Sequence, residues 1–340
     1  MVYLDMNVWV AMAKGIGEDT QSWVDHVASL ARLVESGKIV IPLSAAHYLE
    51  LWHRLKQESR EDIGRLMQKL SGFATLAPVQ TIRKLEIEAF VSRVTGIDKW
   101  VNHSDILGNG VCHAFGSRFG RFRFVESLAS QDGTVPEGRP VAAPTTLVGV
   151  DLKGPEWEWI QLVGTPEILA SYGVERTPEH RIGSQRLADE LRFRELLRTE
   201  PRMRERLRDL LITDELTALT TVINQACWEP RVQPHSLFLE NPSFATPAEA
   251  MREFVLGLPS VDARITLREW KHRDLNHPWE QHDHTDIYTL AAVIPYVDII
   301  ITERRWAHMV KASGLAKRHK GEVKGLSEFA SVVETLTNNA

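Results

Sequence analysis

Short apolar runs separated by longer amphipathic stretches characterise both ends of this 340-residue chain. Residues 2–4, 38–43 and 298–301 are rich in large or β-branched apolar side chains that show little alternation with polar ones. Such runs are typical of parallel strands that are covered on both faces. Between them, apolar residues recur at spacings of three and four, which predicts helices. Strands that alternate with helices predict an α/β fold built on a parallel sheet.

Several helices and one further strand are expected in the two terminal regions. Ser44 is placed to begin one helix and Gly37 to end another. The further strand is expected at residues 75–79. The helices are expected at residues 7–14, 22–35, 45–56, 60–70, 81–94, 286–294, 306–313 and 326–336.

The middle of the chain has a different pattern. From about residue 96 to 270, glycine, proline and arginine become more frequent and the alternation of strands and helices fades. An exposed loop is expected at residues 131–144, and helices at residues 178–211, 214–227 and 246–256. We therefore expect a core formed by residues 1–95 and 271–340, with residues 96–270 as a large, mostly helical insertion.

Composition narrows the class of protein. A hydrophobic content of 43% and a charged content of 25% are ordinary for a globular protein. A net charge of −5 argues against a protein that coats nucleic acid along its whole surface, but leaves room for a local basic patch.

The cysteines and the apolar runs bear on the compartment. Cys112 and Cys227 cannot form a disulfide framework, which favours a reducing compartment. The longest apolar run, residues 287–301, is too short to span a bilayer and is interrupted by Pro295 and Asp298. No signal-peptide pattern opens the sequence. We expect a cytoplasmic protein that does not bind membranes.

Acidic residues follow or flank the predicted strands. Asp5 directly follows the first strand, and Glu303 closely follows the last. Glu50 lies in the helix that follows the second strand. Asp286 lies near the start of the helix that precedes the last strand. Sites in open parallel sheets form at the carboxyl ends of the strands, so we expect these four carboxylates to converge. Clustered carboxylates raise one another's pKa, and oxygen ligands prefer hard ions such as Mg²⁺ or Mn²⁺.

Four short segments of this constellation resemble the motifs of PIN-domain nucleases. They are Leu4-Asp5-Met6-Asn7, Ser44 with Glu50, Thr285-Asp286 with Ala291-Ala292, and Ile301-Thr302-Glu303. The resemblance covers residues 1–95 and 271–340. It implies a three-layer α/β/α core with a parallel sheet, an acidic Mg²⁺ or Mn²⁺ site and cleavage of RNA. It also implies that Asp5, Glu50 and Asp286 bind metal, that Asn7 supports the site through hydrogen bonds, and that Thr302 positions the ligands.

The fourth motif departs from the family pattern. The family commonly has Thr, one residue, and then Asp, whereas here Arg304 takes that place and Glu303 comes one residue early. Either Glu303 is the fourth acid, with its longer side chain making up the offset, or the site has three acids. Asp298 and Asp283 are substitutes for the fourth acid.

Each candidate also has a structural interpretation. Asp5 could be a turn residue, Glu50 a solvated helix residue, and Asp286 a complement to a helix N-terminus. Asn7 could cap a helix. The order of the four motifs favours the metal role. The cluster His277, His282, Asp283 and His284 could bind zinc, but helix-entry chemistry is favoured for it.

Basic residues could provide a surface for the substrate. Arg304 and Arg305 are best placed to hold a phosphate, because they lie beside the predicted acids. Residues 115–124 interleave arginine with phenylalanine, as stacking platforms do, although a hairpin with a core face is favoured. Residues 181–208 are rich in arginine, and a solvated helix with ion pairs is favoured there. His47 and His53 flank Glu50 and could contact a phosphate or lie on a plain helix face.

These features together predict a metal-dependent endoribonuclease. Its insertion would select substrate, regulate access or bind a protein partner, and self-association is left open. A toxin-like or defence role follows from the resemblance alone. The alternatives are a structure-specific DNA nuclease and a catalytically degenerate PIN-like module that binds RNA or protein.

Overall fold

The protein is described here from a computed structural model. The described residues are 1–54, 56–122, 125–126, 139–140, 151–164, 180–228, 230–237, 246–274, 276–319 and 321–339. For residues 125–126, 139–140 and 180–184 only the backbone is described.

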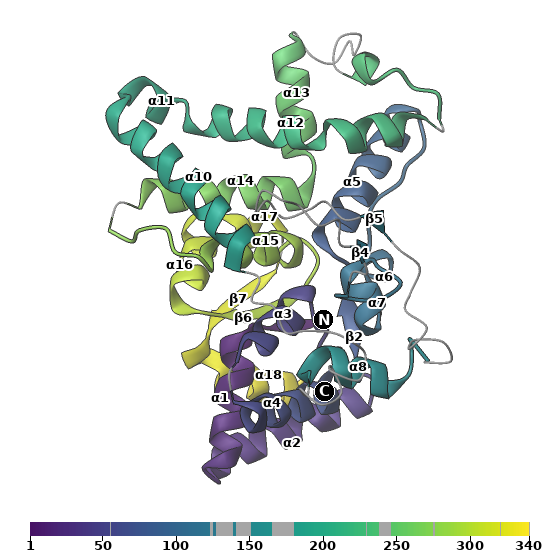
Figure 1. Ribbon diagram of the computed structural model, residues 1–340, viewed down its shortest axis with the longest axis vertical. Helices are drawn as coiled ribbons and strands as arrows, with labels where there is room; N and C mark the ends of the chain where they lie inside the picture. Colours follow the sequence, from purple (N-terminus) through teal and green to yellow (C-terminus); the bar gives the residue numbers. More distant parts are fainter. Residues whose placement is uncertain are drawn as a thin grey trace.

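A three-stranded parallel sheet joins the two ends of the chain (Figure 1). Its strands are β1 (Val2–Leu4), β6 (Ile299–Thr302) and β7 (Glu322–Gly325), in the order β1-β6-β7. All neighbours are parallel, and Ile300 pairs with Tyr3 on one side and with Val323 on the other. The prediction of an α/β fold with a parallel sheet is therefore confirmed, although the sheet is small and most of the described chain is helical.

Apolar side chains on both faces of this sheet pack against helices. Val2, Leu4 and Ile301 belong to one cluster, with residues of α1 (Met6–Gly17), α2 (Gln21–Glu35) and α18 (Phe329–Asn338). Successive residues of a strand point to opposite faces. Tyr3, Ile300 and Val323 accordingly belong to a second cluster, with residues of α15 (Asp283–Val293) and α16 (Arg304–Ala312). Coverage on both faces explains why these strands show so little polar alternation.

The strand predicted at residues 38–43 does not form. This segment is extended, and the carbonyl of Val40 accepts a hydrogen bond from the N–H of Val2 at 2.9 Å. Leu43 makes only an isolated parallel bridge to Thr75. Pro42 lies between these two contacts and has no N–H, so a continuous ladder cannot run through it.

A second correction concerns the strand expected at residues 75–79. The strand there is β2 (Ala74–Leu76), and it pairs antiparallel with β3 (Leu107–Asn109) rather than joining the parallel sheet. A short antiparallel pair is also formed by β4 (Val125–Glu126) and β5 (Arg139–Pro140). The loop expected at residues 131–144 lies outside the described residues, apart from Arg139 and Pro140.

The other helices agree with the periodicity in most places. Ser44 is at the N-cap of α3 (Ala45–His53), and Gly37 has a φ of 71° just beyond the end of α2, as predicted. The remaining α-helices are α4 (Gln57–Ser71), α5 (Val79–Val94), α6 (His103–Ile106), α7 (Gly110–Phe115), α8 (Pro155–Val163), α10 (His180–Thr199), α11 (Pro201–Glu205), α12 (Leu207–Trp228), α13 (Pro247–Leu256), α14 (Pro259–Arg273) and α17 (Leu315–His319). Short 3-10 helices are η2 (Pro234–Leu237) and η3 (Leu326–Glu328).

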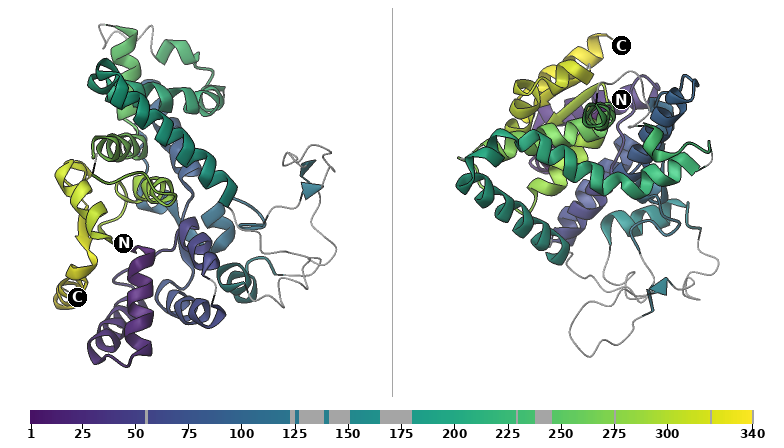
Figure 2. Two further views of the ribbon diagram at one scale, coloured as in Figure 1. Left: turned by 60° about the vertical axis from the view of Figure 1, so that its left-hand side comes forward. Right: turned by 90° about the horizontal axis from the view of Figure 1, so that it is seen from above.

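Helices from the middle of the chain also contribute to the core. Ala263 and Leu267 of α14 belong to the second cluster, and Trp157 and Leu162 of α8 belong to the first. A third apolar cluster joins α5, α12, α13 and α14. Figures 1 and 2 place α12 and α13 at one end of the molecule and α1 and α2 at the other. Packing therefore crosses the expected boundary, and the division into core and insertion stays a prediction.

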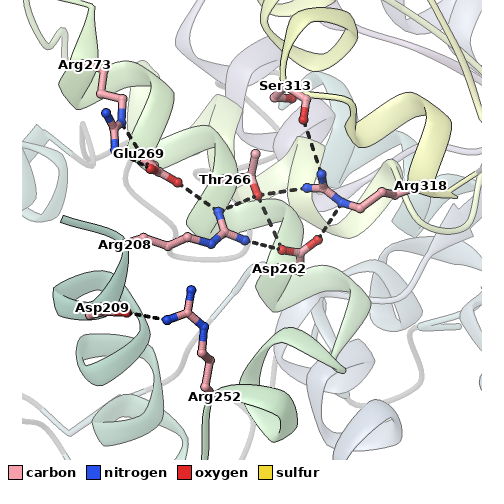
Figure 3. Close-up of polar contacts among 9 residues, drawn as sticks. All are labelled: Arg208, Asp209, Arg252, Asp262, Thr266, Glu269, Arg273, Ser313 and Arg318. Atoms are coloured by element: carbon pink, nitrogen blue, oxygen red, sulfur yellow. Dashed lines mark hydrogen bonds and ion pairs between the residues drawn. The ribbon is translucent and has the colours of Figure 1, made fainter. Parts of the chain in front are cut away.

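Paired charges join α12, α14 and α17 (Figure 3). Asp262 accepts hydrogen bonds from Arg208 at 2.9 Å and from Arg318 at 3.1 Å. Glu269 accepts from Arg208 at 2.9 Å and from Arg273 at 2.8 Å. Each of these carboxylates thus faces two guanidinium groups. Among the helices that the structure describes, none has both the length and the apolar character needed to cross a membrane.

Candidate active site

Asp5 lies at the carboxyl edge of the parallel sheet. Its backbone N–H bonds to the carbonyl of Ile301 at 2.9 Å, which carries the β1–β6 pairing one residue beyond the strand. Its side chain accepts from the N–H of Met6 at 2.8 Å and from the hydroxyl of Thr302 at 2.6 Å. Burial raises the pKa of Asp5, and these two hydrogen bonds act against that rise. Thr302 is fully buried at the end of β6, so it holds Asp5 in place from the neighbouring strand.

His47 attaches helix α3 to the end of strand β1. Its Nδ1 accepts a hydrogen bond from the N–H of Ser44 at 2.9 Å, which leaves the proton on Nε2. Nε2 then donates to the carbonyl of Leu4 at 2.8 Å. Burial lowers the pKa of His47 to about 4, so the ring is neutral at physiological pH. His47 is therefore a buried positioning residue that brings α3 to Asp5, not a phosphate contact.

Glu50 lies one turn beyond His47 and faces the other acids. Burial raises its pKa well above the usual value, and the charges of Asp5, Asp286 and Glu303 raise it further, in that order. None of the side chains in the described part of the chain forms an ion pair with Asp5 or Glu50. Two of the carboxyl groups at this edge, those of Asp5 and Glu50, therefore have no positively charged partner among the described side chains.

Asp286 lies in the first turn of α15. Its Oδ2 accepts from Nε1 of Trp306 at 3.0 Å and lies 3.5 Å from Nη2 of Arg305. Burial and the charge of Asp5 raise the pKa of Asp286 to about 7, against the hydrogen bond from Trp306. At neutral pH this carboxyl group is therefore close to half protonated.

Glu303 is the N-cap residue of α16 and is the most exposed of the four, with 47% of its side chain accessible. Its carboxylate lies 3.4 Å from Nε of Arg305. The charge of Glu303 raises the pKa of Asp5, Glu50 and Asp286. The structure therefore brings together all four predicted acids, including the one from the irregular motif.

The two substitutes for the fourth acid lie elsewhere. Asp298 precedes β6 and pairs with the amino group of Met1, so the length of the strand, about 13 Å, separates it from Thr302. Asp298 therefore lies at the end of β6 that is remote from Asp5. Asp283 is fully buried and forms ion pairs with Lys271 and Arg305, each at 2.9 Å. Its charge is neutralised inside the protein.

Asn7 was expected to support the site through hydrogen bonds. Its Oδ1 is buried and has no hydrogen-bond partner among the described residues. An amide oxygen two residues after Asp5 is thus left as an unused acceptor. A buried acceptor without a partner costs roughly 1–3 kcal/mol, which a bound cation or water would recover.

The donor set suits a hard divalent cation. Among the described residues, no group of three or more His, Cys, Asp or Glu side chains is arranged so that it could hold a metal ion. The side chains that converge nevertheless offer only oxygen atoms, and like charges repel unless a cation lies among them. Asp5, Glu50, Asp286 and Glu303 are the residues that would hold Mg²⁺ or Mn²⁺.

A basic and aromatic cavity of about 700 Å³ adjoins the acids. Arg305 and Trp306 belong to both places, since they line the cavity and contact Asp286. Arg304 is exposed, and none of the described carboxylates pairs with it. Arg305 lies within 4 Å of Glu280, Asp283, Asp286 and Glu303. Of the two arginines predicted to hold phosphate, Arg304 is thus the more available.

Trp270 and His308 complete this cavity and were missed from the sequence. Trp270 is in α14, which lay inside the expected insertion, and His308 is in the helix that carries Arg304. Positions 304 and 308 are one helical turn apart, so the spacing itself was a usable signal.

The other basic stretches have structural roles in the described residues. Phe122 is buried against Trp52 and Trp157, and Phe115 packs on Tyr48, which supports the core interpretation of residues 115–124. Helix α7 ends at Phe115, residues 116–121 form turns rather than the strands of a hairpin, and residues 123–124 lie outside the described part. In the arginine-rich stretch, Arg198 pairs with Glu195 on the exposed helix α10.

Two histidines of the other cluster contact polar side chains outside the set of four acids, and His277 also lines the cavity beside that set. His277 pairs with Asp274 at 2.7 Å, and His284 contacts Arg186 at 2.9 Å. His282 is exposed at the N-cap of α15.

Comparison with known proteins adds no relative: no family model matches the chain, and no curated protein or solved structure is similar enough to count as a match.

Proposed function

We propose that this chain is a metal-dependent nuclease of PIN-like type that hydrolyses RNA phosphodiester bonds. One observation carries the proposal. Four acids from separate segments meet at the carboxyl edge of a parallel sheet, and burial together with mutual repulsion raises the pKa of three of them. Helices on both faces of the sheet support a three-layer core.

The residues of the chain have distinct parts in this proposal. Thr302 and the N–H of Met6 orient Asp5, and Trp306 orients Asp286. When bound, Mg²⁺ or Mn²⁺ would lower the pKa of a water molecule and neutralise charge on a phosphate. By the family resemblance, the products would carry 5′-phosphate and 3′-hydroxyl ends.

The cavity beside the acids supports nucleic acid as the substrate. Arg304 can donate to a phosphate oxygen, and the partly exposed ring of Trp270 can stack on a base. Both line the cavity that Arg305 and Trp306 connect to Asp286, so a protein whose net charge is −5 has basic residues beside the proposed site. The choice of RNA over DNA as the substrate rests on the resemblance to PIN-domain nucleases alone.

A cleavage assay tests the proposal directly. The purified chain is incubated with single-stranded RNA, duplex RNA and DNA in the presence of Mg²⁺, Mn²⁺ or EDTA. We expect cleavage of RNA with metal and none with EDTA, and we expect Asp5→Asn and Asp286→Asn each to abolish it. Asp298→Asn is the matched control, because it removes a carboxylate at the opposite end of β6. Metal-dependent cleavage that survives both site substitutions would refute the assignment.

A second candidate is a module that binds RNA without cleaving it. The irregular fourth motif favours it, because Glu303 is half exposed and lies against Arg305. The same assay, combined with a binding measurement, separates the two: binding without cleavage under every metal supports the module. Preferential cleavage of branched DNA would instead identify a structure-specific DNA nuclease.

A further inference from the structure

A second cavity, of about 470 Å³, lies on the other side of helix α15 from Asp286. His284 and Tyr288 line it, and residues two positions apart on a helix face nearly opposite directions. Arginines from three helices also line this cavity: Arg83 of α5, Arg186 of α10, and Arg264 and Arg268 of α14.

Two of these arginines have buried nitrogen atoms with unused hydrogen-bond donors. Arg83 is 7% exposed, and its Nε and Nη2 have no hydrogen-bond partner among the described residues. Nε of Arg264 is also buried and has no hydrogen-bond partner among the described residues. Both guanidinium groups lie over the ring of Tyr288, at 5.2 and 5.4 Å from its centre, so they face the cavity together. Buried charged donors without acceptors are costly, and an acceptor in the cavity would remove that cost.

Carboxylates also line the cavity, those of Asp189, Glu190 and Asp214, and Glu215 pairs with three of the arginines. Glu215 lies 2.8 Å from Arg264, 3.4 Å from Arg268 and 3.5 Å from Arg83. The contact with Arg83 is an ion pair that is too long for a good hydrogen bond.

Arg268 is better satisfied than its neighbours. It also pairs with Glu190 at 3.0 Å and with Asp214 at 2.7 Å. Burial lowers the pKa of Arg264, and the charges of Arg83 and Arg268 lower it further against the effect of Glu215. Arg83 and Arg264 therefore still have room for an added negative group.

We propose that this cavity binds a small organic phosphate of about mononucleotide size, with its phosphate on Arg83, Arg186 and Arg264. The planar guanidinium group matches the oxygens of a phosphate. A volume of about 470 Å³ lies within the range of small-molecule sites, roughly 300–1,000 Å³, and exceeds the need of a bare ion. Ala218, Leu219 and Val222 of α12 form an apolar wall for the organic part.

This proposal does not depend on the nuclease activity, so binding is measured with EDTA present. Calorimetry and thermal unfolding of the full chain are followed with inorganic phosphate, AMP and adenosine. We expect AMP to bind and to raise the Tm, inorganic phosphate to bind more weakly, and adenosine to have no effect. Equal effects of AMP and adenosine, or binding of phosphate without AMP, would overturn the proposal.

A matched pair of substitutions locates the ligand. Arg186 and Arg198 are both exposed arginines of α10, but only Arg186 lines the cavity. Loss of a hydrogen bond to a charged group predicts that Arg186→Ala weakens AMP binding about tenfold or more, while Arg198→Ala leaves it unchanged. Equal affinities in the two variants would overturn the proposal.

Two further variants complete the test. Arg83→Met keeps the unbranched apolar stem of the side chain and removes its donors, and it should abolish binding if it folds. Should it not fold, the result with Arg186→Ala decides. Arg304→Ala leaves the second cavity intact and should not change AMP binding. A loss there would place the phosphate in the cavity beside the acids instead and would refute the inference.

Discussion

The acidic edge of the sheet and the α12–α14 interface use the same residue types in opposite ways. In Figure 3, Asp262 and Glu269 each meet two arginines, so their burial is compensated. At the sheet edge, Asp5 and Glu50 meet other carboxylates and, within the described chain, no cation. A buried charge with a partner contributes to the fold, whereas buried like charges oppose it. This difference is the physical reason for the proposal that a cation binds at the edge.

Glu50→Gln should reduce cleavage strongly, because it removes the acid on which the other three charges act. Cleavage should fall by about 10³-fold, the loss typical of a key electrostatic contact. The free energy of unfolding at pH 8 should stay the same or rise, since a repelling charge is gone. Rate assays and urea denaturation measure the two quantities. If Glu50→Gln is inactive because it unfolds, the carboxylates of the sheet edge stabilise the fold as those of the α12–α14 interface do, and the contrast between the two regions is wrong.

Asp262→Ala should have the reverse effect. It leaves Arg208 and Arg318 without their shared carboxylate, and we expect a loss of about 2–4 kcal/mol in the free energy of unfolding. The rate per folded molecule should not change. Asp209→Ala is the control, because Asp209 and Arg252 are both about half exposed, and it should cost at most about 0.5 kcal/mol. Equal costs for the two variants would show that the network of Figure 3 is not stabilising.

The pH dependence of stability sharpens the comparison. A carboxyl group whose pKa is raised on folding stabilises the folded state while it is protonated. The contribution of Asp286 should therefore be fully present below about pH 4 and lost as the pH rises through about 7. Relative to Asp286→Asn, the wild type should lose on the order of 4 kcal/mol between pH 4 and 8.

Metal should reverse that loss. Mn²⁺ should raise the Tm more at pH 8 than at pH 6, because the ligands bind as carboxylates. Thermal unfolding with and without EDTA measures this effect. A Tm shift that does not depend on pH would show that Asp286 is not a ligand of the metal.

Glu303→Gln should give the smallest effect on activity. Its side chain is 47% exposed and is partly neutralised by Arg305, so we expect a loss of about tenfold. Cleavage titrated with Mn²⁺ should show the loss mainly as weaker metal dependence. A loss as large as that of Glu50→Gln would make Glu303 a full member of the acidic set.

The sequence was informative where the signal is local. Unalternated apolar runs identified β1 and β6, and spacings of three and four identified most helices near their observed bounds. Strand β7 was missed because Glu322 and Lys324 make it look polar, which is common for an edge strand. Helix α14 was missed because it buries charged residues such as Arg268 and Lys271, which hides its apolar periodicity.

The candidate site was predictable to the same extent. That Asp5, Glu50 and Asp286 follow or flank strands and helices in a fixed order is a property of the sequence. Which acid is the fourth was not, because Asp298 and Glu303 lie at opposite ends of one short strand and only the pairing of β6 with β1 decides which end faces Asp5. The role of His47 was likewise hidden, since its acceptor, the carbonyl of Leu4, is 43 residues away.

The sequence by itself determined the elements and the number of acids available to a site, because periodicity and residue type act over a few positions. The tertiary structure alone decided which charges are paired. Asp283 pairs with Lys271 and Arg305, and Asp262 pairs with Arg208 and Arg318. The charges that act on Glu50 are those of other acids. Whether a charge stabilises a protein or equips a site depends on what lies within a few ångströms of it, and those neighbours come from distant parts of the chain.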